Sequence, residues 1–124
     1  MILVDTNVLM YTAGADHPHE APSIAFLKLA ADGRVEACLD AEVLQEILHR
    51  YRLARQIVPR VLPVEAEAVD RARELMERAP HLRARDAVHG AIALSLGGEI
   101  CSYDADLDAI PGLKRRQPDE CPRH

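Results

Sequence analysis

The sequence predicts an α/β/α sandwich around a mainly parallel sheet of four to five strands. Short apolar runs of strand length alternate along the 124 residues with longer stretches of helical periodicity. This alternation favours a parallel sheet covered by helices. Since 48% of the residues are hydrophobic and no Ser/Gly/Pro-rich linker divides the chain, we expect one domain over residues 1–124, whose last few residues form a flexible tail.

The elements follow one another in a simple order along the chain. Strands are predicted at residues 2–4, 35–39 and 100–103, with a short fourth strand at 113–117. Helices are predicted at residues 6–12, 21–31, 41–55, 64–78 and 84–96. Proline and glycine support the boundaries of the second helix, because Pro22 lies near its start and Gly33 just beyond its end.

Composition limits the classes of function that fit. The 20 acidic and 15 basic residues give a net charge of -5, which argues against a general electrostatic attraction to nucleic acid, so any such contact must be local. No membrane-spanning run or secretory signal is apparent, and we expect a cytoplasmic protein. Cys38, Cys101 and Cys121 lack metal-site spacing, so we expect buried, reduced thiols.

Two carboxylates follow predicted strands directly. Asp5 comes after the first strand, in VDTNVL, and Asp104 comes after the strand at residues 100–103, in SYDADL. The carboxyl ends of parallel strands meet at one edge of a sheet, where ligands bind, so the two side chains can reach the same site. Each aspartate could also simply cap the helix that follows it.

The predicted helix at residues 41–55 offers a third acid. Glu42 lies roughly opposite its apolar stripe, while Glu46 lies nearer the border and is the better candidate. The simpler interpretation of Glu46 is a solvated side chain that pairs with Arg50 one turn later.

The predicted helix at residues 84–96 offers a fourth acid at its first turn. Asp86 would be favoured there by the helix dipole even without a function. Gly90, Ala93 and Gly97 follow it on one side of the helix, and this face of small residues predicts close packing against a neighbouring element.

A cluster of such acids has a definite chemistry. Carboxylates that lie close together repel one another and take up protons unless a cation neutralises them, and hard oxygen ligands favour Mg²⁺ or Mn²⁺. A bound metal of this kind activates water and receives phosphate oxygens. The predicted reaction is hydrolysis of an RNA or DNA phosphodiester, with no nucleophilic side chain.

Four stretches together carry a family resemblance: VDTNVL, EVLQEILHRY, RDAVHGAIAL and SYDADLDAIPGL. In order and spacing they resemble the acidic motifs of PIN domains, and specifically of VapC-type toxins of toxin–antitoxin pairs, over essentially the whole chain. The resemblance implies a Mg²⁺-dependent endoribonuclease, with Mn²⁺ as an alternative metal, a cognate antitoxin and a homodimer. It also implies that the antitoxin's C-terminal segment lies across the acidic groove.

The same resemblance assigns roles to residues. It implies that the catalytic and metal-binding acids are Asp5, Glu46, Asp86 and Asp104. Thr6 and Asn7 would complete the first motif, and Ser102 would occupy the hydroxyl position two residues before the last acid. Asp106 matches a further acid found in many members. Leu107 stands where many members have phenylalanine, a difference that we expect to affect packing more than chemistry.

Two further features have competing interpretations. His89, three residues after Asp86, would be either a supporting or substrate contact or, more simply, a partly exposed helix residue. The basic run at residues 114–116 would protect an edge strand from pairing with other chains, with contact to phosphate as the alternative.

Two other functions also fit parts of the pattern. A phospho-acceptor receiver domain gathers acids at strand ends, and Asp40 could be its acceptor. However, Asp5 has no acidic neighbour, and the only lysines, Lys28 and Lys114, lie outside the position that a receiver requires. An inactive PIN fold that only binds partners is the second alternative, and the presence of all four acids argues against it.

Overall fold

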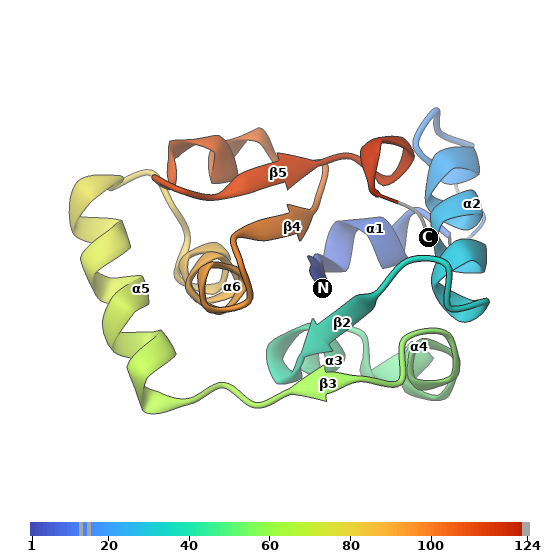
Figure 1. Ribbon diagram of the computed structural model, residues 1–124, viewed down its shortest axis with the longest axis horizontal. Helices are drawn as coiled ribbons and strands as arrows, with labels where there is room; N and C mark the ends of the chain where they lie inside the picture. Colours follow the sequence, from blue (N-terminus) through green and yellow to red (C-terminus); the bar gives the residue numbers. More distant parts are fainter. Residues whose placement is uncertain (13, 15, 123–124) are drawn as a thin grey trace.

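A computed structural model describes residues 1–12, 14 and 16–122 and shows a five-stranded sheet in the order β3-β2-β1-β4-β5 (Figure 1). All four strand pairs are parallel, which confirms the predicted fold class. The strands are β1 (Ile2–Val4), β2 (Ala37–Asp40), β3 (Val61–Leu62), β4 (Glu99–Cys101) and β5 (Lys114–Arg116).

Helices connect the strands and cover both faces of the sheet. The α-helices are α1 (Thr6–Met10), α2 (Glu20–Ala31), α3 (Ala41–Glu46), α4 (Tyr51–Ile57), α5 (Ala66–Arg78) and α6 (Ala84–Ser95). Three short 3₁₀ helices complete the described chain: η1 (Leu48–Arg50), η2 (Ala105–Ala109) and η3 (Pro118–Glu120). In Figure 1, α5 and α6 lie toward one end of the view and α2 lies at the other.

Two apolar clusters form because successive side chains of a strand point to opposite faces. In β1, Leu3 packs into the cluster that contains buried residues of α5 and α6. Its neighbours Ile2 and Val4 pack into the other cluster, with residues of α1, α2, α3 and α4. The central strand is therefore buried on both faces, as its uninterrupted apolar sequence predicts.

The structure corrects the prediction of one continuous helix over residues 41–55. Helix α3 ends at Glu46, because Ile47 leaves the helical conformation (φ -117°, ψ 34°) before η1 and α4 continue the chain. The break allows Ile47 to be buried, while the next residue, Leu48, is 66% exposed. The prediction also omitted β3, which has only two residues and so is too short for periodicity to indicate it.

Several smaller expectations are also settled by the described residues. Cys38, Cys101 and Cys121 are free and buried, as predicted. Strand β5 lies at one edge of the sheet, and two of its basic side chains are engaged: Arg115 with Asp108, and Arg116 with Glu99.

The remaining outcomes concern a helix face, membrane spans and the end of the chain. The small-residue face of α6 packs closely, because a Cβ at Gly90 would collide with Cδ1 of Ile110. Within the described part of the chain, no helix is both long enough and apolar enough to cross a membrane. Of the expected C-terminal tail, residues 123 and 124 lie outside the described residues.

Candidate active site

One pocket of about 360 Å³ brings together the four predicted acids, Asp5, Glu46, Asp86 and Asp104. We call it the acid pocket; its other lining residues are Thr6, Asn7, Met10, Tyr11 and Arg85. Asp5 follows β1 and Asp104 follows β4, which is the neighbour of β1 in the sheet. The parallel sheet thus places acids that are distant in sequence at the same edge.

Asp5 is buried, with 4% of its surface exposed, and it is held from two directions. Its Oδ1 accepts a hydrogen bond from the Thr6 backbone N–H at 2.7 Å, which caps α1. Its Oδ2 accepts one from the Ser102 hydroxyl, also at 2.7 Å. Asp5 therefore caps a helix and lines the pocket at the same time, so the two interpretations of this residue are compatible.

The Ser102 hydroxyl joins the ends of β1 and β4. While it donates to Asp5, its Oγ accepts from the Asn7 side-chain amide at 3.0 Å and from the Asp104 backbone N–H at 3.0 Å. The Asn7 amide oxygen in turn accepts from the Tyr103 N–H at 3.2 Å. These bonds fix Asp5 relative to the segment that carries Asp104.

The two acids of the last motif have different positions. Asp104 is half-buried in the acid pocket, and its Oδ1 accepts a hydrogen bond from the Asp106 backbone N–H at 2.9 Å. The Asp106 side chain is exposed and does not line the pocket. Asp106 therefore contributes to this geometry through its backbone.

Asp86 experiences the electrostatic conflict that a cluster of acids creates. It lies in the first turn of α6 and is 6% exposed. Burial, together with the negative charges of Asp104 and Asp5, raises the pKa of Asp86 to about 6, although Arg85 and His89 act in the opposite direction. A cation in the pocket would relieve this conflict.

Glu46 is the last residue of α3 and lies between two basic side chains. Its Oε2 accepts a hydrogen bond from Nη1 of Arg85 at 3.1 Å, and its Oε1 lies 3.5 Å from Nε2 of His89. The predicted pairing with Arg50 is absent from the ion pairs of the described residues. Sequence reasoning missed Arg85, whose only signal is its position directly before Asp86.

His89 corrects a sequence prediction. It is 1% exposed, so the expectation of a partly exposed helix residue is wrong. Nδ1 of His89 lies 2.5 Å from Oδ2 of Asp40. Asp40 itself is completely buried. Burial by itself would lower the pKa of His89, but the hydrogen bond with Asp40 and the charge of Asp40 outweigh it and raise the pKa to about 9. The burial of Asp40 also argues against a phospho-acceptor role.

The donor set fits a hydrated Mg²⁺ or Mn²⁺ ion better than a fully enclosed metal. All four predicted ligands are carboxylates, the donors that these ions prefer. Among the described residues, however, no three His, Cys, Asp or Glu side chains form a ready-made metal cage. Mg²⁺ keeps several waters and often binds through only one or two carboxylates, so such a cage is not required.

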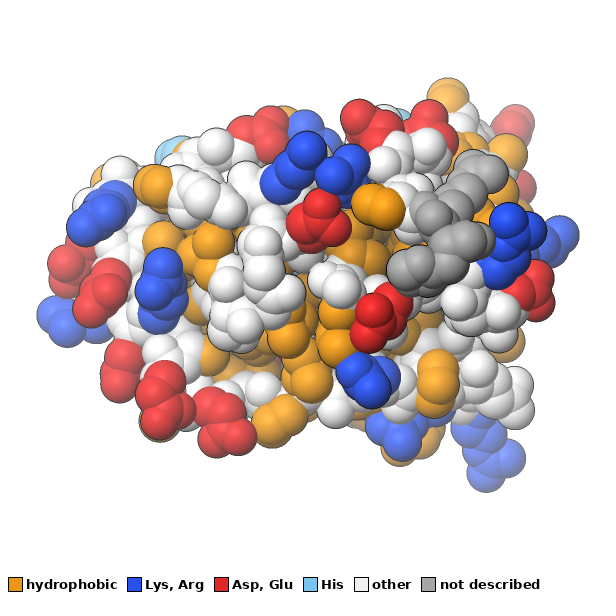
Figure 2. All heavy atoms as spheres, in the orientation of Figure 1, with side chains coloured by type: hydrophobic (Ala, Val, Ile, Leu, Met, Phe, Trp, Pro, Cys, Tyr) orange, Lys and Arg blue, Asp and Glu red, His pale blue; other side chains and the backbone are white. Residues whose placement is uncertain are grey.

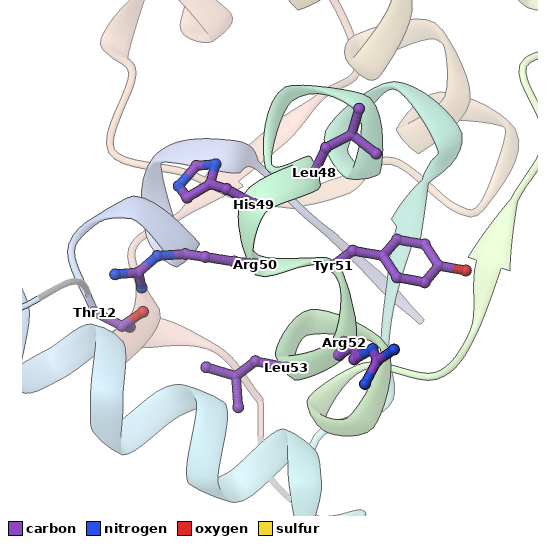
Figure 3. A pocket seen from close by; sticks show the side chains of 7 residues that line it. All are labelled: Thr12, Leu48, His49, Arg50, Tyr51, Arg52 and Leu53. Carbon is purple, nitrogen blue, oxygen red and sulfur yellow. The ribbon is translucent and has the colours of Figure 1, made fainter.

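A second, wider hollow lies on η1 and α4, and Figure 3 shows its lining residues: Thr12, Leu48, His49, Arg50, Tyr51, Arg52 and Leu53. In this view Arg50 extends toward Thr12, while Tyr51 points the other way. Leu48 and Leu53 are 66% and 52% exposed. Since the lining of this hollow includes no carboxylate, the candidate chemistry lies in the acid pocket.

The charges on the surface are mixed. Figure 2 shows acidic and basic side chains interspersed over one face of the molecule, with apolar side chains between them. This face offers no broad basic surface for a nucleic acid, in agreement with the net charge of -5.

Comparisons with known proteins agree on the family and the fold of the chain. The family model described as the PIN domain matches residues 2–113. Ribonuclease VapC13 of Mycobacterium tuberculosis is 39% identical over 129 residues, an alignment that covers 93% of this chain and 98% of the relative. A toxin–antitoxin complex from Klebsiella pneumoniae contains a similar chain, with a TM-score of 0.72, 17% identity and coverage of 95% and 98%. The Mycobacterium tuberculosis toxin VapC20, described as cleaving the sarcin–ricin loop, gives a TM-score of 0.68, 22% identity and coverage of 88% and 94%.

Proposed function

The chain belongs to the PIN domain family and is a ribonuclease of the VapC toxin type, and we propose that it hydrolyses RNA in the acid pocket with a divalent metal ion. One observation carries the choice of site. Four carboxylates from separate parts of the sequence line the same pocket at the carboxyl edge of the sheet. An inactive binding module would have no need to keep mutually repelling acids together.

We assign the metal to the carboxylates of Asp5, Asp86, Asp104 and Glu46, with Mg²⁺ as the ion and Mn²⁺ as an alternative. When bound, such an ion would activate a water and neutralise charge on the scissile phosphate. The residues around it have supporting tasks. Ser102 and Asn7 hold Asp5 in place, while the Thr6 N–H occupies the other oxygen of Asp5.

RNA contact would be local in this proposal. The side chain of Arg85 is 47% exposed at the acid pocket, so it can meet a phosphate oxygen without a broad basic surface. Because water is the nucleophile, no covalent intermediate forms between the chain and the RNA. Cleavage within a strand needs only that the pocket is open at the surface.

Cleavage of RNA by the purified protein tests the assignment. We expect Asp5→Asn to lower the rate by orders of magnitude in Mg²⁺ because it removes a charge from the metal site while nearly preserving shape. Asp86→Asn and Asp104→Asn should act similarly, and Glu46→Gln more mildly. Asp106→Asn is the matched control, since this exposed carboxylate lies outside the pocket lining. Full activity of Asp5→Asn in saturating Mg²⁺ would remove Asp5 from the site.

We further propose that a cognate antitoxin inhibits the chain, and that the chain forms a homodimer. One support is the toxin–antitoxin complex that contains a chain of similar fold. The acid pocket suits an arginine or lysine side chain. The hollow on η1 and α4 exposes Leu48 and Leu53 for an apolar contact. The antitoxin's C-terminal segment would lie across the acid pocket and block it. A peptide of this segment should suppress cleavage, and replacement of its basic residue should weaken the inhibition.

A further inference from the structure

A buried row of polar side chains runs from the sheet to the wall of the acid pocket. It consists of Asp40 at the end of β2, His89 in α6 and Glu46 at the end of α3. Asp40 is completely buried and His89 is 1% exposed. Buried polar groups of this kind are costly unless they are paired, so their arrangement calls for a physical reason.

Asp40 is the fixed end of this row. Its Oδ1 accepts a hydrogen bond from the Val43 backbone N–H at 2.9 Å and thereby caps α3, while its Oδ2 lies 2.5 Å from Nδ1 of His89. Both carboxylate oxygens are therefore engaged. The imidazole of His89 is thus held at one nitrogen by a group that is itself anchored to the backbone.

The other nitrogen of the imidazole is directed at Glu46. Nε2 of His89 lies 3.5 Å from Oε1 of Glu46. Both atoms are buried, and neither has a hydrogen-bond partner elsewhere among the described residues. The distance is longer than a good hydrogen bond, but the two unpaired atoms face each other, and a small movement would join them.

Glu46 is also contacted from the solvent side, by a side chain that is far more exposed than His89. Arg85 binds Oε2 of Glu46 at 3.1 Å, and its side chain is 47% exposed. An exposed ion pair of a long, flexible side chain restrains its partner little. The buried imidazole is the more rigid of the two restraints on Glu46.

We propose that His89, anchored by Asp40, is a positioning residue that holds Glu46 in place for metal binding. The inference rests on the proposed metal-dependent function of the acid pocket, and it adds two residues that line no part of that pocket. The competing view is that Asp40 and His89 only join β2 to α6. Interactions that orient a metal ligand typically contribute 10- to 100-fold to metal affinity or activity, so the two views differ measurably.

Two amide substitutions of His89 test the contacts of its two ring nitrogens one at a time. The amide nitrogen of His89→Asn falls near the position of Nδ1, so it can still donate to Asp40 but cannot reach Glu46. The amide nitrogen of His89→Gln falls near the position of Nε2, so it can still donate to Glu46. We expect His89→Asn to weaken Mn²⁺ binding, measured by calorimetry, about 10- to 100-fold. His89→Gln should stay within about threefold of the wild type even if its melting temperature is the lower of the two.

A double-mutant cycle with Glu46→Gln shows whether His89 acts through Glu46. In the Glu46→Gln protein, adding His89→Asn should cause little further loss of Mn²⁺ affinity, because the group that His89 positions has lost its charge. In RNA cleavage, His89→Asn should lower kcat and leave KM nearly unchanged. Asp40→Ser offers a second route, since serine still caps α3 but lacks the negative charge and the second oxygen that contacts the imidazole; we expect weaker Mn²⁺ binding there too.

The outcomes distinguish this inference from the proposed function. A wild-type protein that binds Mn²⁺ and cleaves RNA, together with unchanged Mn²⁺ affinity in His89→Asn and Asp40→Ser, would overturn the positioning role alone. Losses of affinity that follow the melting temperatures of the variants, or that add fully in the cycle, would also overturn it. A wild-type protein with neither Mn²⁺ binding nor cleavage would overturn the proposed function and this inference with it.

Discussion

At the scale of single residues, the acids and the partners of Asp5 could be predicted from the sequence, but the buried partners of Glu46 could not. Asp5, Glu46, Asp86 and Asp104 stand in motifs whose order and spacing are visible in the sequence, and all four line one pocket. His89 was considered as a supporting contact, but its place between Asp40 and Glu46 was not foreseen, because its burial depends on how α6 packs against the sheet. A histidine on a helix has no local pattern that separates a buried position from an exposed one.

The Asp40–His89 pair predicts how stability depends on pH. The pKa of His89 is about 9 in the folded protein and close to 6.5 in the unfolded chain, so the folded state holds the proton more tightly. Its contribution is complete below pH 6.5 and is lost as pH rises toward 9. In this window the free energy of unfolding should fall by up to about 1.4 kcal/mol per pH unit.

Urea unfolding at a series of pH values between 6 and 9 measures this slope. His89→Gln removes the titrating group and should flatten the dependence, whereas His81→Gln, at an exposed histidine, should leave it intact. A wild-type stability that rises or stays constant from pH 7 to pH 9 would contradict a charged, paired His89.

At the scale of elements, the predictions failed where tertiary packing overrides local periodicity. The strand at residues 2–4 was predicted at its observed bounds, because three buried apolar residues precede a polar motif. The helix over residues 41–55 was predicted to be continuous, but it ends after Glu46, where Ile47 leaves the helical conformation and is buried. This break gives Glu46 its place at a helix end beside α6, a placement that no helical projection could supply.

Helix α6 closely approaches the end of η2. The effect of Gly90→Ala on stability should therefore have opposite signs in the wild type and in the Ile110→Val protein. Gly90→Ala should gain up to about 1 kcal/mol from helix propensity, but its Cβ would collide with Cδ1 of Ile110, which is buried. Overpacking typically costs about 1–3 kcal/mol, so we expect a net loss of stability. Ile110→Val removes that methyl group, and in the Ile110→Val protein the same Gly90→Ala substitution should be stabilising.

Thermal unfolding of the wild type, the two single variants and the double variant measures the effect of Gly90→Ala with and without the Ile110 methyl group. A Gly90→Ala protein as stable as the wild type would mean that Ile110 moves aside at no cost. An equal loss of stability with and without Ile110→Val would show that the methyl group is not the obstacle.

At the scale of the whole molecule, the strand order explains why the acids meet. Strands β2 and β4 both flank β1. The segments that follow these three strands carry Glu46, Asp104 and Asp5, which are far apart in sequence. Alternation of strands and helices predicts a parallel sheet but does not determine its order, so this meeting was inferred from the general rule for sheet edges. The assembly has an energetic consequence, because burial, together with the negative charges of Asp104 and Asp5, raises the pKa of Asp86 to about 6.

This repulsion predicts that metal stabilises the folded protein. A divalent ion that binds the native acid pocket and not the unfolded chain adds about 1.4 kcal/mol at ten times its Kd, which corresponds to roughly 4–7 °C for a domain of this size. Mg²⁺ or Mn²⁺ at millimolar concentration should therefore raise the melting temperature.

The variant with all four acids neutralised (Asp5→Asn, Glu46→Gln, Asp86→Asn and Asp104→Asn) should lose this response. Without metal, this variant should melt no lower than the wild type, because the repulsion between the carboxylates is gone. Asp106→Asn should respond as the wild type does, because its side chain is exposed outside the pocket. A melting temperature unaffected by either ion, or an equal rise in the neutralised variant, would show that the four carboxylates do not form a metal site.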